Sequence, residues 1–254
     1  MNNILAALIF FTRLPWWRLR EVPKEAFEHV VDWWPFVGWL TGGVMALVFW
    51  GTTAAGLPIA VSAILAVMGR MLLTGALHED GLADFCDGFG GGTSRERTLE
   101  IMKDSHIGTY GVLGLMVVLS LLAISISNVG AEAAVLLLFF DVLAKSAASL
   151  VTGQLPYARS TEGAKNKVVY VTPDMGERIV HLFRVIAALL PAWALCAWQG
   201  VPNVVWIVPV PFVVEWLLTR WMRNRIGGYT GDCCGALFVL CEISAYLAYT
   251  IINK

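Results

Sequence analysis

Three aspartates at helical spacing are the residues of this sequence whose pattern most clearly indicates chemistry. Asp80, Asp84 and Asp87 follow one another at i, i+4 and i+7, so on a helix their side chains share one face. Carboxylates stacked in this way repel one another, and near a membrane the cost rises because a carboxylate resists the loss of its hydration. A bound cation offsets that cost. Oxygen ligands favour Mg²⁺, which proteins hold with a few carboxylates and the phosphates of a substrate.

The acidic segment, residues 74–111, also contains groups suited to a phosphate ligand. Glycines occupy four of the five positions 88–92, where they leave the backbone able to approach anionic oxygens closely; a flexible turn is the alternative. Thr93 or Ser94 is the predicted N-cap of a short following helix. Lys103 is the predicted phosphate contact, while Arg97 has nearby glutamates, Glu96 and Glu100, to pair with.

Further titratable side chains flank the aspartates. Asp104 adds a carboxylate beyond the glycines, and Glu79 adds one directly before Asp80. His78 and His106 bracket the region, and either could carry a proton near neutral pH; an orienting hydrogen bond is the alternative role for each. A solvated helix end would not need this many acids, which favours a metal site.

A second group of charged residues lies within the apolar stretches. Glu242 is ten residues beyond Asp232 and inside an apolar helix, so it is a functional candidate by default. Arg70 is its predicted pairing partner. Asp141 and Lys145 stand at i, i+4, where they can neutralise each other as a structural pair.

The composition indicates that the candidate site residues are positioned by helices that span a membrane. The chain has 254 residues, 57% hydrophobic and 15% charged, with a mean hydropathy of +0.68, whereas soluble domains average about 25% charged. A bilayer-spanning helix needs about 20 apolar residues. About seven stretches meet this need: 36–56, 58–77, 107–128, 131–152, 179–199, 203–222 and 233–252. The predicted fold is therefore a single all-α polytopic membrane bundle over residues 1–254.

The positions of lysine and arginine predict its orientation. They occur before the first stretch and after the second, fourth and sixth, whereas 51–57, 128–131 and 200–203 contain none. Because basic loops face the cytoplasm, the acidic segment is expected there. A short N-terminal helix near residues 4–11, interfacial or re-entrant, is expected to be anchored by Trp16 and Trp17. The five cysteines lack zinc-site spacing and are expected to be free thiols.

With these features the chain resembles a known family over essentially its whole length. The resembling blocks are FFTRLP at 10–15, WPFVGWLTGG at 34–43, TGALHEDGLADFCDGFGGG at 74–92, EIMKDSHIGTYG at 100–111, PYAR at 156–159 and GGYTGDCCGALFVLCE at 227–242. The family is that of cobalamin synthase, the adenosylcobinamide-GDP ribazoletransferases of bacteria and archaea.

The resemblance implies an inner-membrane enzyme that needs Mg²⁺. It would join adenosylcobinamide-GDP to α-ribazole, or to α-ribazole 5′-phosphate, and release GMP. Asp80, Asp84, Asp87 and Asp104 would hold the metal, and Glu79 or His78 would take the proton of the attacking 3′-hydroxyl. The residues expected to contact substrate or complete the site are Lys103, His106, Arg159, Arg225, Asp232 and Glu242.

The partners expected on this basis are the two substrates and the bilayer, without nucleic acid. Other cobalamin-assembly enzymes are further candidate partners, and so is a second copy of the chain. The small residues Gly38, Gly42 and Gly43 are predicted to pack either within the protein or against that copy.

Two other functions remain open from the residues alone. A CDP-alcohol-type lipid phosphotransferase shares the D-x-x-D-G spacing of residues 84–88, but the following A-R is absent and position 108 is glycine instead of aspartate. A cation-coupled transporter could use Asp80 and Glu242 as ion ligands, but the halves 1–127 and 128–254 show no internal repeat of the kind common in transporters.

Overall fold

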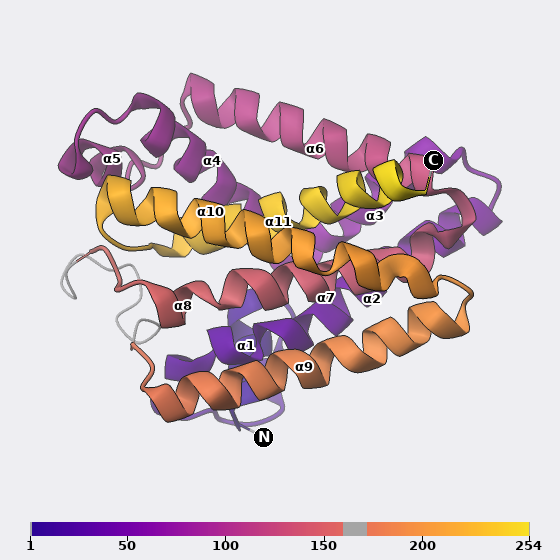
Figure 1. Ribbon diagram of the computed structural model, residues 1–254, viewed down its shortest axis with the longest axis horizontal. Helices are drawn as coiled ribbons and strands as arrows, with labels where there is room; N and C mark the ends of the chain where they lie inside the picture. Colours follow the sequence, from indigo (N-terminus) through magenta and orange to yellow (C-terminus); the bar gives the residue numbers. More distant parts are fainter. Residues whose placement is uncertain (1, 160–171, 254) are drawn as a thin grey trace.

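Helices make up the fold that the computed structural model describes, for residues 2–159 and 172–253 (Figure 1). They are α1 (Asn2–Phe11), α2 (Trp34–Ala54), α3 (Ile59–Thr74), α4 (Leu77–Gly91), α5 (Arg95–Ile101), α6 (Thr109–Val129), α7 (Ala133–Ser149), α8 (Val151–Gln154), α9 (Met175–Trp198), α10 (Pro209–Ile226) and α11 (Gly231–Ile252). Short 3-10 helices are η1 (Trp16–Arg18), η2 (Lys24–His29), η3 (Val31–Trp33), η4 (Gly130–Glu132) and η5 (Pro202–Ile207). Between described residues the β-type pairing is limited to one bridge, Tyr157 to Tyr229. The predicted all-α class is confirmed.

The helices form the membrane bundle that composition predicts. Among the described residues, six helical segments are long and apolar enough to cross a bilayer, and there are seven if the bent pair α3–α4 counts as one span. The central segment Ala133–Gln154, which contains α7 and α8, has 78% of its most apolar window buried, against 17% for the peripheral α6. Large apolar side chains on the outer helices, such as Leu47, Met116 and Trp206, are exposed, as expected for a surface that faces lipid.

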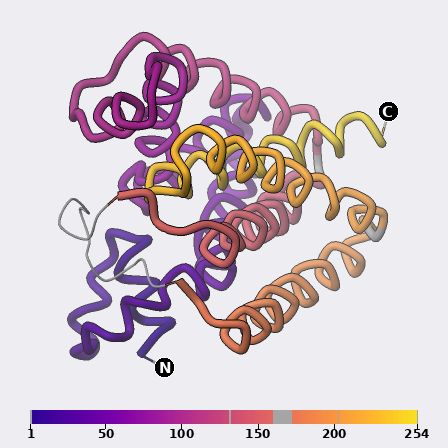
Figure 2. Tube along the Cα trace, turned by 60° about the vertical axis from the view of Figure 1, so that its left-hand side comes forward, coloured from indigo at the N-terminus to yellow at the C-terminus, as the bar shows by residue number. Residues whose placement is uncertain are grey.

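The two ends of the bundle differ in charge, as the sequence predicts. In Figure 1 the segments after α5 and α10, and residues 155–159 after α8, lie together at the left end. Each of these segments contains or adjoins a basic residue. The turns without lysine or arginine, between α2 and α3, α6 and α7, and α9 and α10, lie at the opposite end. The tube in Figure 2 shows the same separation, with the C-terminus at the end that lacks basic turns.

The second apolar stretch is interrupted before it reaches the acids. Helix α3 ends at Thr74, and the next two residues, Gly75 and Ala76, have φ angles of 71° and 56°. This left-handed backbone ends an α-helix, and α4 leaves at 93° to α3. The expectation of a span over 58–77 with acids at its end is therefore wrong in detail. The aspartates lie on a separate helix, set nearly at right angles to α3.

Glycines allow close packing in the interior. A Cβ on Gly38 would lie 2.9 Å from the Cα of Val142, and one on Gly42 would lie 2.8 Å from the Cα of Leu138, so α2 packs on α7 through these two glycines. Gly43 has no atom within 4 Å of its Cβ position. Of the two alternatives for this surface, packing within the protein is confirmed for Gly38 and Gly42.

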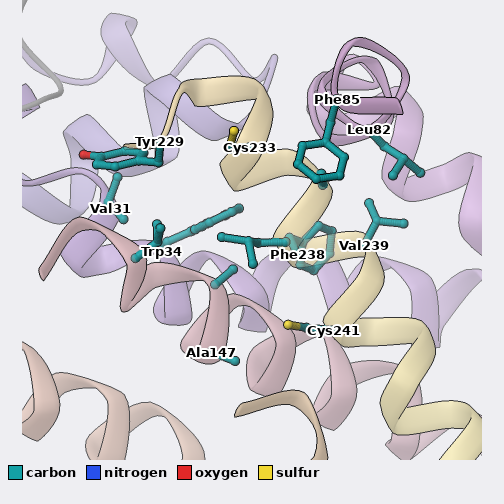
Figure 3. Packing of buried hydrophobic residues seen from close by; sticks show 14 of the residues in the cluster. Val31, Trp34, Leu82, Phe85, Ala147, Tyr229, Cys233, Phe238, Val239 and Cys241 are labelled. Carbon is teal, nitrogen blue, oxygen red and sulfur yellow. The ribbon is translucent and has the colours of Figure 1, made fainter. Parts of the chain in front are cut away.

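Helix α4 crosses α11 at a similarly close contact. A Cβ on Gly81 would lie 3.0 Å from the carbonyl oxygen of Asp232, and one on Gly235 would lie 2.9 Å from that of His78. Figure 3 shows the apolar side of this crossing, where Phe85 of α4 lies near α11 and Phe238 of α11 faces Trp34 of α2. The crossing brings the start of α11, with Asp232, against the acid-bearing helix.

Candidate active site

The three predicted aspartates lie on one helix, α4, but in different environments. Asp80 is exposed, Asp84 is half-buried and Asp87 is buried. We call the side of α4 that carries Asp80 and Asp84 the acid face. It lies next to the start of α11, because Gly81 packs on the backbone of Asp232. The helical spacing read from the sequence is thus correct, and burial then separates Asp87 from the other two.

Asp87 ties α4 to the first turn of α6. Its Oδ2 accepts a hydrogen bond from the amide of Gly108 at 2.7 Å, and its Oδ1 accepts one from the amide of Gly111 at 2.9 Å. The first amides of a helix lack intrahelical partners and carry partial positive charge, which a carboxylate satisfies. A Cβ on either glycine would lie 2.5 Å from a carboxylate oxygen. Asp87 therefore positions the segment that leads into α6.

Asp232 joins the site from α11, and Arg159 joins it from the segment after α8. The Arg159 guanidinium donates to Oδ2 of Asp232 at 3.3 Å, with only 8% of the arginine side chain exposed. Thr230, the N-cap of α11, also donates to that oxygen at 3.3 Å. Two backbone hydrogen bonds fix the segments together, from Ala158 N to Tyr229 O and from Tyr229 N to Pro156 O. The structure thus places these two predicted substrate residues in contact.

A cavity of about 780 Å³, here called the α5–α6 pocket, opens beside Asp87. Its lining includes the predicted residues Lys103, Asp104 and His106. Asp104 Oδ1 accepts hydrogen bonds from the amide of His106 at 3.0 Å and lies 2.7 Å from its Nδ1. These bonds lower the pKa of the Asp104 carboxyl. Asp104 and His106 therefore form one unit on the pocket wall.

Arg97 and Glu100 occupy another part of the pocket wall. They form the predicted surface pair, with 2.7 Å between Arg97 Nη1 and Glu100 Oε2. Ser94 caps α5 by accepting from the amide of Arg97 at 3.2 Å.

The glycines after Asp87 do not form the phosphate-binding loop or the flexible turn considered from the sequence. Residues 88–91 form the last turn of α4, and the three glycines among them leave room for neighbouring residues. A Cβ on Gly88 would lie 2.3 Å from Met102, and one on Gly90 would lie 2.6 Å from the ring of Tyr110. The carbonyl of Gly92 accepts a hydrogen bond from Arg225, a predicted substrate contact. The glycine run is a packing surface, and Arg225 holds its end.

Arg95 is a structural contact that sequence reasoning missed. Its guanidinium donates to the carbonyl of Ile226 at 2.9 Å and to that of Ala158 at 2.8 Å. It thereby joins α5, the end of α10 and the segment that carries Arg159. Its position at the start of a short helix does not predict hydrogen bonds to carbonyls so far away in the sequence.

Behind the acid face, the bundle encloses five charged side chains that we call the core cluster. Its members are Arg70, Glu79, Asp141, Lys145 and Glu242. Arg70 lies 2.5 Å from Glu242, 3.4 Å from Glu79 and 3.5 Å from Asp141, and Lys145 contacts Asp141. The predicted pairs Arg70–Glu242 and Asp141–Lys145 are confirmed, but they share one network across α3, α4, α7 and α11.

The two predicted proton carriers, Glu79 and His78, lie on the interior sides of α4. Glu79 is 2% exposed and belongs to the core cluster, and His78 is 1% exposed. The His78 ring lies 5.5 Å from the Trp34 ring and 4.7 Å from the Phe238 ring, centre to centre. No described residue hydrogen-bonds either ring nitrogen. The structure therefore does not bring these two side chains, or Glu242, to the acid face.

The carboxylates of the site determine whether it could hold Mg²⁺. Within residues 2–159 and 172–253, no three His, Cys, Asp or Glu side chains are grouped so as to hold a metal ion. Mg²⁺ commonly keeps several waters and takes only one or two carboxylates together with substrate phosphates. Asp80 and Asp84, one turn apart, offer that smaller set. The site fits Mg²⁺ that is shared with a diphosphate and does not fit an all-protein cage.

Comparison of the sequence with known proteins identifies the family of the chain. The sequence model of the cobalamin-5-phosphate synthase family matches residues 3–250. The chain belongs to this family. The resemblance found in the sequence blocks is thereby confirmed, and the acid face, the α5–α6 pocket and the Arg159–Asp232 pair all lie within the matched region.

Individual members of the cobalamin-5-phosphate synthase family agree over the full length. An adenosylcobinamide-GDP ribazoletransferase of Leptothrix cholodnii is 38% identical, covering 96% of this chain and 92% of its own. Relatives of the same name from Shewanella amazonensis and Shewanella woodyi are 37% and 35% identical, and cover 99% and 95% of this chain and 96% and 92% of their own. No solved structure matches.

Proposed function

We propose that this chain is an adenosylcobinamide-GDP ribazoletransferase of cobalamin biosynthesis. It joins adenosylcobinamide-GDP to α-ribazole, or to α-ribazole 5′-phosphate, and releases GMP. The observation that carries the proposal is the match to relatives of that name over 95% or more of the chain. Two carboxylates on one face of α4, Asp80 and Asp84, beside a pocket large enough for a nucleotide also support it.

The transfer breaks a phosphoanhydride bond and forms a phosphate ester bond. A ribose hydroxyl of α-ribazole bonds to the phosphorus that carries cobinamide, the bond from that phosphorus to the oxygen bridging to GMP breaks, and GMP leaves with this oxygen. Mg²⁺ at Asp80 and Asp84 would neutralise charge on the diphosphate and on leaving GMP. Asp87 and Asp104, which the sequence placed in the metal set, act in this account through the start of α6 and the pocket wall.

The remaining polar residues of the site position the reactants. Lys103, on the wall of the α5–α6 pocket, is a point charge suited to a phosphate. Asp232, already held by Arg159, orders the side of the acid face next to α11. The hydroxyl proton passes in this account to a carboxylate of the acid face, because Glu79 and His78 are enclosed by the bundle.

The chain is a multi-pass membrane protein, and we place it in the cell's inner, cytoplasmic membrane. Helix α4, which carries the acid face, lies toward the end of the bundle where the basic segments gather, and basic segments stay in the cytoplasm. The site would then open to the compartment that contains nucleotides. A substrate that enters from this side needs no passage through the bilayer.

Release of GMP by purified protein in lipid tests the proposal. Adenosylcobinamide-GDP, α-ribazole and Mg²⁺ should give GMP and a joined corrinoid product, and EDTA should stop the reaction. GMP formed equally well without divalent metal would contradict the metal role. CMP release from a CDP-alcohol, with none from the corrinoid substrate, would favour the lipid phosphotransferase. Cation-driven uptake into vesicles without any transfer would favour the transporter.

A further inference from the structure

The α5–α6 pocket contains an aromatic ring held in one orientation. A Cβ on Gly90 would lie 2.6, 2.8 and 3.0 Å from Cγ, Cδ1 and Cδ2 of Tyr110. Because three ring atoms are almost equally near, the backbone of α4 lies against one face of the ring. The side chain is nevertheless 54% exposed and lines the pocket. Its other face is thus open, as a platform on which a planar heterocycle can stack.

A carboxylate on the same pocket wall is also held in place. His106 donates its amide to Oδ1 of Asp104, and its ring nitrogen is 2.7 Å from the same oxygen. Among the described residues no hydrogen bond reaches the second oxygen, Oδ2. The same bonds keep the carboxyl ionised by lowering its pKa. An ionised carboxylate only accepts hydrogen bonds, so its ligand must present donors.

Guanine is the nucleobase whose chemistry matches this wall. Its Watson–Crick edge carries two adjacent donors, N1–H and the N2 amino group, that can reach the two oxygens of one carboxylate. Adenine and cytosine each present a donor beside an acceptor, and that acceptor would face a carboxylate oxygen. Glu100, another acid of the pocket, already accepts from Arg97 at 2.7 Å, which makes it a matched control.

The pocket also lies at a suitable place along α4. Asp87 and Gly91 line it, and at 1.5 Å per residue Asp84 and Asp80 lie about 5 and 10 Å from Asp87 along the helix axis. A nucleoside diphosphate with its base in the pocket can extend over this length. Its phosphates would then extend toward the acid face from a pocket that Lys103 also lines.

We propose that the α5–α6 pocket binds the guanine base of the nucleotide half of the substrate, with Tyr110 stacking on the base and Asp104 selecting it through N1–H and the N2 amino group. The proposal rests on the transferase function proposed above and adds the residue that sets base specificity. It gives Asp104 a role in base recognition in place of the metal role expected from the sequence.

Equilibrium binding of GMP, IMP and XMP to the full-length protein in detergent tests the proposal. The wild type should bind GMP about 10-fold or more tighter than IMP, which lacks the N2 amino group. Asp104→Asn should weaken GMP binding by about 10- to 100-fold. It should also make XMP the better ligand, because the carboxamide can donate to the C2 carbonyl of xanthine.

Matched variants separate recognition from misfolding. Glu100→Gln should leave the order of GMP, IMP and XMP unchanged. Tyr110→Ala should weaken all three alike, and Tyr110→Phe should restore them. If Asp104→Asn keeps the wild-type ratio of GMP to XMP affinity, the base assignment is overturned.

Turnover of the wild type, measured in the same preparation, keeps this outcome apart from a failure of the proposed function. Wild type that releases GMP from adenosylcobinamide-GDP, with an unchanged affinity ratio in Asp104→Asn, leaves the transferase standing and removes only the base assignment. Wild type that binds GMP but never releases it from that substrate removes the proposed function instead.

Discussion

Glu79 and Asp80 are neighbours on α4, and the structure gives them opposite environments. Glu79 points into the bundle, 2% exposed, and pairs with Arg70 at 3.4 Å. Asp80 is exposed on the acid face. The same contrast separates the core cluster, where carboxylates meet cations in the buried interior, from the acid face, where Asp80 is exposed and Asp84 is half-buried. An acidic residue type alone therefore does not identify a catalytic residue. The side of the helix on which the acid lies determines whether it can reach a ligand.

The core cluster has a structural explanation. It joins α3, α4, α7 and α11 directly behind the 93° break between α3 and α4. Buried charges contribute little net stability as pairs, but removal of one partner leaves an uncompensated charge at high cost. Such a network therefore favours one arrangement of α4 over others. The orientation of the acid face depends on it, which makes the two regions physically coupled.

The largest expected effect comes from removing the shared cation. Arg70→Met leaves Glu79, Asp141 and Glu242 with only Lys145 to balance them, and we expect a loss of about 3–5 kcal/mol in unfolding free energy. The midpoint of thermal unfolding in detergent should fall by at least about 6 °C. An unchanged midpoint would show that the cluster does not hold the bundle together.

The next effect is on catalysis and comes from the acid face. Asp84→Asn should lower GMP release by at least about 100-fold, the scale of losing one group that stabilises developing charge. The variant should still insert into the membrane at the wild-type level. Near-normal turnover by this variant would remove the acid face from the reaction.

A smaller effect should follow when the cluster loses an acid instead of a base. With all five groups ionised, the core cluster has three carboxylates and two cations, so Glu242→Gln balances it while keeping an oxygen for Arg70. We expect a loss of about 1 kcal/mol, well below that of Arg70→Met, in the same unfolding measurement. Equal losses from the two variants would contradict the charge-balance explanation.

The smallest effect concerns an exposed pair near the pocket. Arg97 and Glu100 are 56% and 69% exposed, and such pairs contribute about 0.5 kcal/mol or less. Arg97→Ala should therefore leave the unfolding midpoint within experimental error of the wild type. A clear drop would mean that this pair does more than link two surface side chains.

Spacing and hydropathy predicted the larger features of this molecule. Apolar stretches predicted the spans, and the positions of lysine and arginine predicted the charge asymmetry of the bundle. The i, i+4, i+7 spacing predicted a common helix for the aspartates. The pairs Arg70–Glu242 and Asp141–Lys145 could also be predicted, since a charge inside an apolar helix needs a partner.

Other features depend on contacts between distant segments and could not be read locally. The break at Gly75 and Ala76 depends on a left-handed backbone at an alanine, which no residue preference indicates. The glycines at 88–92 resembled a phosphate loop, and only the positions of Met102 and Tyr110 show that they are packing sites. Likewise, the capping of α6 by Asp87 joins residues more than twenty positions apart.

Turnover and stability of two neighbouring variants, Glu79→Gln and Asp80→Asn, test the central claim most directly. The measurement is GMP release per folded molecule in lipid, with the thermal midpoint recorded alongside. Asp80→Asn should keep the wild-type midpoint and lose GMP release, whereas Glu79→Gln should lower the midpoint and keep turnover per folded molecule within about 10-fold. A stable but inactive Glu79→Gln beside an active Asp80→Asn would contradict the assignment of chemistry to the acid face.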